Sequence, residues 1–246
     1  MKNTLMPNSR PTVIAHRCGN TRFPENTVAS AEHSLNAGAD YLEMDVRFTR
    51  DGVPVIVHDE CLRRLFGTEK NVREITISEF MSLHYLDTEE HHPNMLQDFL
   101  QDGLLPLLLH IKEGGTRLEK LIELLDVNQA LSNVVFGVTS INDLELLKKF
   151  DTHLKILGFI KTDSEWPDFL SRGAMIIRLW DKWVAKKLVC GIQNRGGAVW
   201  VMTGSPSEGM VGQTTRERLL LLRDMGVDGI LINDSSFALE VFSKVS

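Results

Sequence analysis

Two carboxylates interrupt an otherwise apolar stretch, YLEMDVRFTRDGVPVIVHDE, that runs over residues 41–60. Glu43 and Asp45 stand two residues apart in it, so in an extended strand both side chains point to the same face. Two carboxylates that share one face repel each other unless a cation lies between them, and hard oxygen ligands suit Mg²⁺, Ca²⁺ or Mn²⁺. The spacing therefore indicates a site for a divalent cation.

Histidine and basic side chains recur where other apolar runs end. His16 and Arg17 follow the first run, His58 ends the run VPVIV, and His110 and Lys112 lie at the end of LPLLLHIK. A pair of histidines can act as general acid and base near neutral pH, while Arg17 and Lys112 can bind an anionic substrate. A cation, a positively charged clamp and two histidines are the groups needed to cleave a phosphate ester.

The elements that carry these residues must bring them together. Short apolar runs alternate with amphipathic helical patterns, one of them a long helix over residues 181–196, which predicts parallel strands joined by helices. Eight such units close a (β/α)₈ TIM barrel, in which residues at the carboxyl ends of the strands meet at one end. An open doubly wound sheet is the alternative, but the chain has no Gly-rich dinucleotide motif. The strands are expected near residues 12–16, 41–49, 105–112, 134–139, 155–160, 174–179, 198–204 and 229–234.

One segment departs from this alternation. Residues 62–102, after the second strand, form an irregular insertion with helical patterns at 77–84 and 95–103. No linker-like stretch divides the chain, so a single domain over residues 1–246 is predicted.

Composition narrows the classes of function. The chain has 246 residues, of which 43% are hydrophobic and 24% charged, with a net charge of −6 and no block of Lys and Arg, so no nucleic-acid partner is expected. The three cysteines are far apart and suggest neither disulfides nor a zinc ribbon. No apolar run approaches the ~18 residues of a membrane-spanning helix, and a cytoplasmic location is predicted. The sequence leaves the oligomeric state undetermined.

Five motifs occur in a characteristic order and spacing. HRCGNTRFPENT is followed by LEMDV and then by FTRDGVPVIVHDE. With these motifs the chain resembles the glycerophosphodiester phosphodiesterases, strongly over residues 13–60 and more loosely to the end of the chain. The resemblance implies a TIM barrel, one divalent cation such as Mg²⁺ or Ca²⁺, and hydrolysis of a small-molecule glycerophosphodiester to an alcohol and glycerol phosphate.

The resemblance also implies roles for individual residues. His16 and His58 match the acid/base pair of the family: one deprotonates a neighbouring hydroxyl of the substrate, and the other protonates the departing alkoxide. Arg17 matches the arginine that contacts the phosphate, and Lys112 matches the lysine of the third-strand motif. Trp200 matches a tryptophan that lines the pocket.

The metal ligands follow the family with one exception. Glu43 and Asp45 match two of its carboxylate ligands, whereas His110 stands where the family has a glutamate. An imidazole ligand would shift the preference of the site towards Mn²⁺ or Zn²⁺. Cys18 replaces the glycine after the histidine and arginine, and Asn233 stands where an aspartate is expected.

Two other functions remain open from the sequence. The barrel could be catalytically impaired and bind a phosphorylated ligand, or it could be a related lyase that releases a cyclic phosphate.

Simpler roles for single residues also remain open. Glu43 and Asp45 could form ion pairs with Arg17 or Arg47, and Trp180 with Asp181 could reach the mouth of the pocket. A second group of potential metal ligands is more simply a solvated loop: His84, Glu89, Glu90, His91 and His92.

Overall fold

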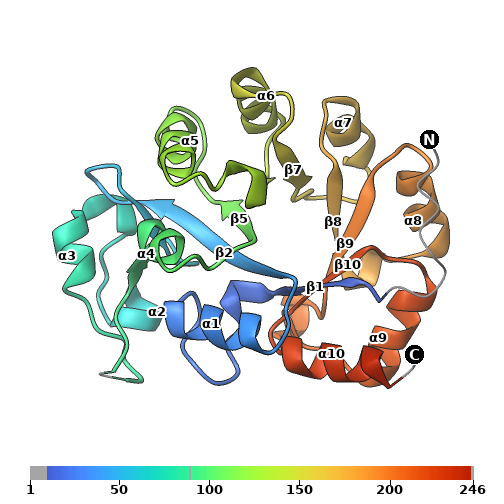
Figure 1. Cartoon of the computed structure of the whole chain (residues 1–246), viewed down its shortest axis with the longest axis horizontal. Coiled ribbons are helices and arrows are strands. Elements are labelled where there is room, and N and C mark those ends of the chain that lie inside the picture. Colours follow the sequence, from blue (N-terminus) through green and yellow to red (C-terminus); the bar gives the residue numbers. More distant parts are fainter. Residues whose placement is uncertain (1–9, 89, 245–246) are drawn as a thin grey trace.

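The computed structural model describes residues 10–88 and 90–244 and shows a closed barrel of parallel strands (Figure 1). The ring closes because β1 pairs with both β2 and β10. This arrangement confirms the predicted (β/α)₈ barrel. Its strands are β1 (Thr12–Ala15), β2 (Tyr41–Phe48), β5 (Leu107–Ile111), β6 (Val134–Val138), β7 (Lys155–Gly158), β8 (Ile176–Trp180), β9 (Ala198–Met202) and β10 (Gly229–Ile232).

Helices surround the ring of strands (Figure 1). Several begin at a side chain that accepts a hydrogen bond from the first turn, as Thr27, Ser140 and Thr215 do. The outer helices are α1 (Val28–Asn36), α5 (Arg117–Val127), α6 (Ile141–Phe150), α7 (Trp166–Ser171), α8 (Lys186–Gln193), α9 (Arg216–Asp224) and α10 (Ser235–Ser243).

The predicted helix over residues 181–196 is divided in the structure. A 3-10 turn, η4 (Asp181–Trp183), precedes α8, and Val184 and Ala185 between them have extended backbone angles. Val184 is buried in the core between strands and helices, so the chain leaves the end of β8 in an extended form before the helix begins. The prediction of one continuous helix is therefore wrong at residues 184 and 185.

The irregular insertion after β2 has a small core of its own. The strand β3 (Pro54–Ile56) pairs antiparallel with β2 and with β4 (Asn94–Met95). Val55, Phe66 and Phe80 belong to its cluster of buried residues. Its helices are α2 (Arg63–Phe66), η2 (Val72–Glu74), α3 (Ile77–Met81) and α4 (Leu96–Gln101).

Side chains fill the inside of the barrel in layers. Adjacent strands of an eight-stranded barrel are staggered by about one residue, so alternate strands contribute the members of each layer. Followed round the ring, the pairings place one layer at Glu43, Gly137, Arg178 and Leu231. The next layer towards the carboxyl ends contains His16, His110, Phe159 and Met202, and the layer beneath contains Ile14, Leu108, Leu157 and Trp200.

Candidate active site

The two carboxylates of β2 meet a histidine of β5 inside the barrel. Glu43 and Asp45 are each only 1% exposed, and Asp45 is paired in register with His110. The Nδ1 atom of His110 lies 3.2 Å from Oδ1 of Asp45 and 3.7 Å from Oε1 of Glu43. One ligand atom from each of the three residues lies within 4.8 Å of the others, so together they can hold a cation.

Lys112 and Arg17 bind these carboxylates from two sides. The Lys112 Nζ lies 2.9 Å from Oδ1 of Asp45 and 3.0 Å from Nδ1 of His110. The backbone N–H of Arg17 donates to Oε2 of Glu43 at 2.8 Å, and its Nε lies 3.7 Å from Asp45. The φ of Arg17 is +52°, a left-handed conformation that turns its amide towards Glu43.

The alternative ion pairs of the carboxylates form only in part. Arg17 lies beside Asp45. Arg47, in contrast, pairs with Glu113 at 3.1 Å and donates to the carbonyl of His58. The ion pair of Arg47 is therefore with Glu113, while Arg17 and Lys112 are the basic residues that pair with Asp45.

Burial sets the protonation of the three potential ligands. Burial and the nearby charge of Asp45 raise the pKa of Glu43 to about 8. Burial acts to raise the pKa of Asp45 too, but Lys112 and His110 hold it well below its ordinary value. Burial and the charge of Lys112 lower the pKa of His110 to about 4, so the imidazole is neutral and can donate a lone pair. Glu43 retains a proton near neutral pH even though Lys112 and Arg17 lie close by, so its carboxyl group can take up further positive charge, and this donor set fits a divalent cation.

His16 is oriented by Asn233. Its Nδ1 lies 2.7 Å from Oδ1 of Asn233, whose Nδ2 donates to the carbonyl of Val211 at 3.0 Å. Because the amide oxygen accepts, Nδ1 carries the proton and Nε2 has a free lone pair. Burial and the charge of Arg17 lower the pKa of His16 to about 4, which keeps the ring neutral.

His58 is held by a different partner. Its Nδ1 lies 2.7 Å from Oδ1 of Asp59, and Asp59 in turn binds Arg64 of α2. The side chain of His58 is 34% exposed, whereas His16 is 6% exposed. The two histidines therefore face the site from different environments, one buried beside an amide and one accessible beside a carboxylate.

Sequence reasoning gave no role to Glu25, Asn26 and Arg64, which hold these residues in place. Glu25 accepts hydrogen bonds from Arg17 at 3.0 Å and from Arg64 Nη2 at 2.6 Å. The Nδ2 of Asn26 donates to Oδ2 of Asp45 at 3.3 Å, and the Oδ1 of Asn26 accepts from the backbone N–H of Asp45 at 3.4 Å. The sequence does contain an indication for two of these residues, because Glu25 and Asn26 belong to the PENT motif.

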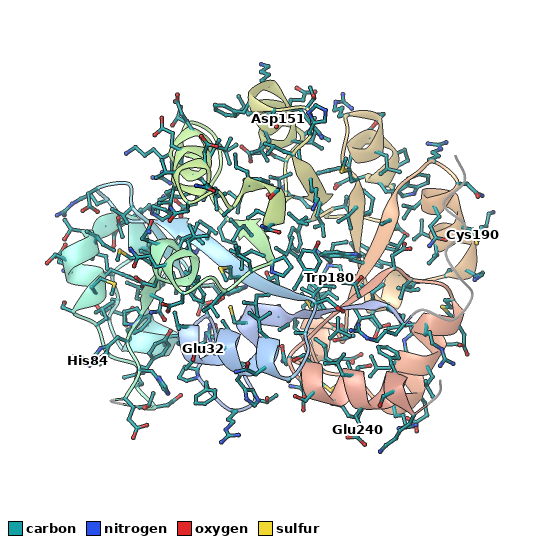
Figure 2. All side chains as sticks on the ribbon, in the orientation of Figure 1. Glu32, His84, Asp151, Trp180, Cys190 and Glu240 are labelled. Carbon is teal, nitrogen blue, oxygen red and sulfur yellow. The ribbon has the colours of Figure 1, made fainter. Side chains whose placement is uncertain are left out.

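The tryptophans Trp200 and Trp180 have different surroundings in the barrel. Trp200 is buried in the layer beneath Glu43 and packs edge-on against Tyr41 at 5.3 Å between ring centroids. Trp180 lies near the middle of the molecule (Figure 2), with its ring 4.2 Å from the guanidinium of Arg178. Asp181 points elsewhere and accepts a hydrogen bond from Arg218 at 2.7 Å.

The histidine-rich loop does not assemble a comparable site within the part of the chain that is described. Glu43, Asp45 and His110 are the group of three potential ligands found there. His84, at the periphery in Figure 2, packs edge-on against His92 at 4.9 Å. Glu89, a further potential metal ligand of this loop, lies outside the described residues.

Comparison with known proteins identifies the family. Residues 16–236 match the model of the glycerophosphoryl diester phosphodiesterase family. The chain belongs to this family. Membership places it among the phosphoric diester hydrolases, as the motifs predicted.

Relatives match over most of the chain or over a part of it. A glycerophosphodiester phosphodiesterase of Caldanaerobacter subterraneus is 28% identical, over 94% of this chain and 98% of its own length. Glycerophosphodiester phosphodiesterase 1 of Rattus norvegicus is 36% identical over 80 residues, which span 32% of this chain and 24% of the rat protein.

Solved structures share the fold. A glycerophosphodiester phosphodiesterase of Thermotoga maritima has a TM-score of 0.76 at 20% identity, covering 95% of this chain and 99% of its own. A phosphodiesterase of Oleispira antarctica, solved with the product sn-glycerol-3-phosphate, has a TM-score of 0.82 at 18% identity, covering 95% and 97%.

Proposed function

We propose that this protein hydrolyses glycerophosphodiesters to an alcohol and glycerol phosphate, with one divalent cation held by Glu43, Asp45 and His110. The observation that carries the proposal is the triad of Glu43, Asp45 and His110, whose two carboxylates are buried. It lies at the same end of the barrel as two histidines and two basic residues. The glycerol phosphate found in the Oleispira antarctica structure is consistent with such a product.

The free lone pair on Nε2 suits His16 to the role of general base. It would accept the proton of the glycerol hydroxyl next to the phosphate, and the resulting alkoxide oxygen would attack phosphorus. The interaction of Nδ1 with Asn233 keeps Nε2 as the acceptor. Asn233 is therefore a positioning residue.

The contact with Asp59 suits His58 to the role of general acid. A carboxylate at Nδ1 fixes the orientation of the ring, so that Nε2 can give a proton to the departing alkoxide. In a second step the two histidines exchange roles, and water opens the cyclic phosphate to glycerol phosphate.

The positive side chains complete the site. Arg17 and Lys112 place positive charge beside the carboxylates and are suited to bind the phosphate. A bound divalent cation supplies Lewis acidity and neutralises negative charge on the phosphate. With neutral His110 among the ligands, we propose Mn²⁺ or Zn²⁺ as effective ions besides Mg²⁺ and Ca²⁺.

The identity of the product separates this function from its alternatives. Glycerophosphocholine is incubated with the protein and each ion, and the reaction is followed by phosphorus NMR. A phosphomonoester signal at the end of the reaction supports the hydrolase. A cyclic phosphate that persists would assign a lyase. Ligand binding without turnover by folded protein would favour the impaired barrel.

A further inference from the structure

A buried arginine without a hydrogen-bond acceptor lies inside the barrel. Arg178, in the middle of β8, is 6% exposed, and its Nε and Nη1 have no hydrogen-bond partner among the described residues. A buried guanidinium whose N–H groups are unpaired is unfavourable unless a partner arrives from outside the chain. The two unpaired donors therefore point to a ligand.

Aromatic rings fix the orientation of this guanidinium. Its Cζ lies 4.2 Å from the ring centroid of Trp180 and 5.3 Å from that of Phe159. Phe159 in turn stacks on His110, with 3.8 Å between centroids and 15° between planes. Contacts with ring faces stabilise the charge but use none of the N–H groups at the edge of the guanidinium.

A glycine makes room for this stack. A Cβ atom built on Gly137 would lie 2.3 Å from the Phe159 ring, so that ring occupies the space over β6 that any larger residue would fill. Gly137 is paired in register with His110, which brings the ring onto the imidazole. The aromatic support of Arg178 and the metal ligand His110 are therefore one packed unit.

Arg178 faces the metal ligands across the barrel. It shares an interior layer with Glu43, and their strands lie on opposite sides of the eight-stranded ring. Burial lowers the pKa of Arg178 to about 10 while the charge of Glu43 opposes the shift, so the guanidinium remains charged at neutral pH.

The other cations of the site already have carboxylate partners. Arg17 binds Glu25 at 3.0 Å, and Lys112 binds Asp45 at 2.9 Å. Arg178 forms no ion pair with a carboxylate among the described residues, and its Nε and Nη1 have no hydrogen-bond partner there. The lumen therefore suits an anion that engages Arg178 directly.

We propose that Arg178 is a substrate-contacting residue, whose Nε–H and Nη1–H bind two oxygens of an anionic group on the substrate. The group is either the reacting phosphate or a second anionic group, such as the carboxylate of a serine headgroup. Naming the substrate in this way rests on the proposed function, but the binding of an anion by Arg178 does not require turnover.

The test measures binding in a His16→Ala background, so that the absence of hydrolysis does not affect it. The probes are sn-glycerol 3-phosphate and glycerophosphoserine, titrated by calorimetry with the activating cation present. Arg178→Met removes the charge, Arg178→Lys keeps the charge but not the planar pair of donors, and Arg218→Met is the control. Arg218 binds Asp181, outside this layer.

We expect Arg178→Met to raise the Kd of at least one probe by roughly 10- to 100-fold, as loss of hydrogen bonds between charged partners does. Arg178→Lys should recover part of the affinity, and Arg218→Met should leave the Kd unchanged. Weaker binding of both probes assigns Arg178 to the phosphate, and weaker binding of glycerophosphoserine alone assigns it to the second anion.

Unchanged affinity of folded Arg178→Met for both probes would overturn the proposal, and Arg178 would then serve only packing. If Arg178→Met does not fold, unchanged affinity of Arg178→Lys for both probes would overturn the proposed pair of hydrogen bonds. The two proposals fail separately. Absence of hydrolysis by the parent protein would reject the proposed function, while an effect of Arg178→Met on Kd would still support the anion site.

Discussion

At the scale of single residues, His110 is the substitution that most alters the chemistry of the metal site. It places a neutral nitrogen next to two carboxylates, with Nδ1 3.2 Å from Asp45. Nitrogen ligands favour Mn²⁺ and Zn²⁺ over Mg²⁺ and Ca²⁺. The ion that activates best should therefore depend on this one side chain.

Replacing His110 with glutamate should move the preference of the site towards harder ions. We expect His110→Glu to lower the Mg²⁺ concentration for half-maximal activity by about tenfold or more, equivalent to about 1.4 kcal/mol. His153→Glu, at a side chain that is 92% exposed, is the matched control. An unchanged order of ions in His110→Glu would show that His110 is not a ligand.

Asn233 controls His16 through one hydrogen bond, and an acidic residue there should change the pH dependence of the reaction. In Asn233→Asp a carboxylate at Nδ1 would stabilise the imidazolium and raise the pKa of His16 from about 4. A general base must be unprotonated, so the acid limb of kcat/KM should move to higher pH, by about one unit or more. Profiles of wild type and Asn233→Asp check this shift.

The control for this measurement is Asn194→Asp, the same substitution at the end of α8. If the acid limb of Asn233→Asp coincides with that of wild type, His16 is not the base whose protonation limits the reaction.

At the scale of elements, an ion-pair network connects the insertion to the barrel. Arg64 of α2 binds Glu25, which precedes α1, and also Asp59, the partner of His58. Burial acts to raise the pKa of Glu25, but Arg64 and Arg17 outweigh it and lower the pKa below its ordinary value of 4.5. Through Asp59, the short helix α2 thereby positions His58, a candidate catalytic residue that lies outside this helix.

Arg64→Met should destabilise the fold in a pH-dependent way. Because the pKa of Glu25 is lower in the folded state, its pairing contributes fully above about pH 4.5 and is lost as the pH falls through the folded-state pKa. Arg64 is 46% exposed and Glu25 keeps Arg17, so we expect a loss of only about 1 kcal/mol at pH 7, shrinking in acid. Urea unfolding at several pH values measures it.

Arg63→Met is the control here, since Arg63 is 70% exposed and its partner among the described residues is Glu69, which is 66% exposed. A loss of stability in Arg64→Met that is the same at pH 3 and pH 7 would contradict an electrostatic origin.

The limits of sequence reasoning are clearest at the elements that break a pattern. The strands of the barrel could be read from apolar runs, and Glu43 and Asp45 from their spacing within one of them. The extended Val184 and Ala185 could not, because burial of Val184 against the barrel overrides a continuous helical pattern.

Arg178 could not be recognised from the sequence either. A single arginine in an apolar strand carries no local signal, and its position opposite Glu43 depends on the closure and stagger of the whole ring. The motifs did indicate residues that meet in space, since Arg17, Glu43 and Asp45 come from two segments that contact each other.

At the scale of the whole molecule, the barrel brings together at one end site residues that are some two hundred positions apart in the sequence, as the contact between His16 and Asn233 illustrates. Within the described residues, every helix is too short or too polar to span a membrane. The single-domain organisation and the cytoplasmic location remain predictions.

The central claim is that the triad of Glu43, Asp45 and His110 holds a divalent cation needed for hydrolysis of a glycerophosphodiester. Its most direct test is the rate of glycerophosphocholine hydrolysis by metal-stripped protein, with Mg²⁺, Ca²⁺, Mn²⁺ and Zn²⁺ added back one at a time. Glu43→Gln and His16→Ala serve as variants, with His153→Ala as the control. We expect activity to require an ion and to fall by about 10²-fold or more in both variants but not in the control. Full activity of the stripped protein, or of Glu43→Gln, would contradict the claim.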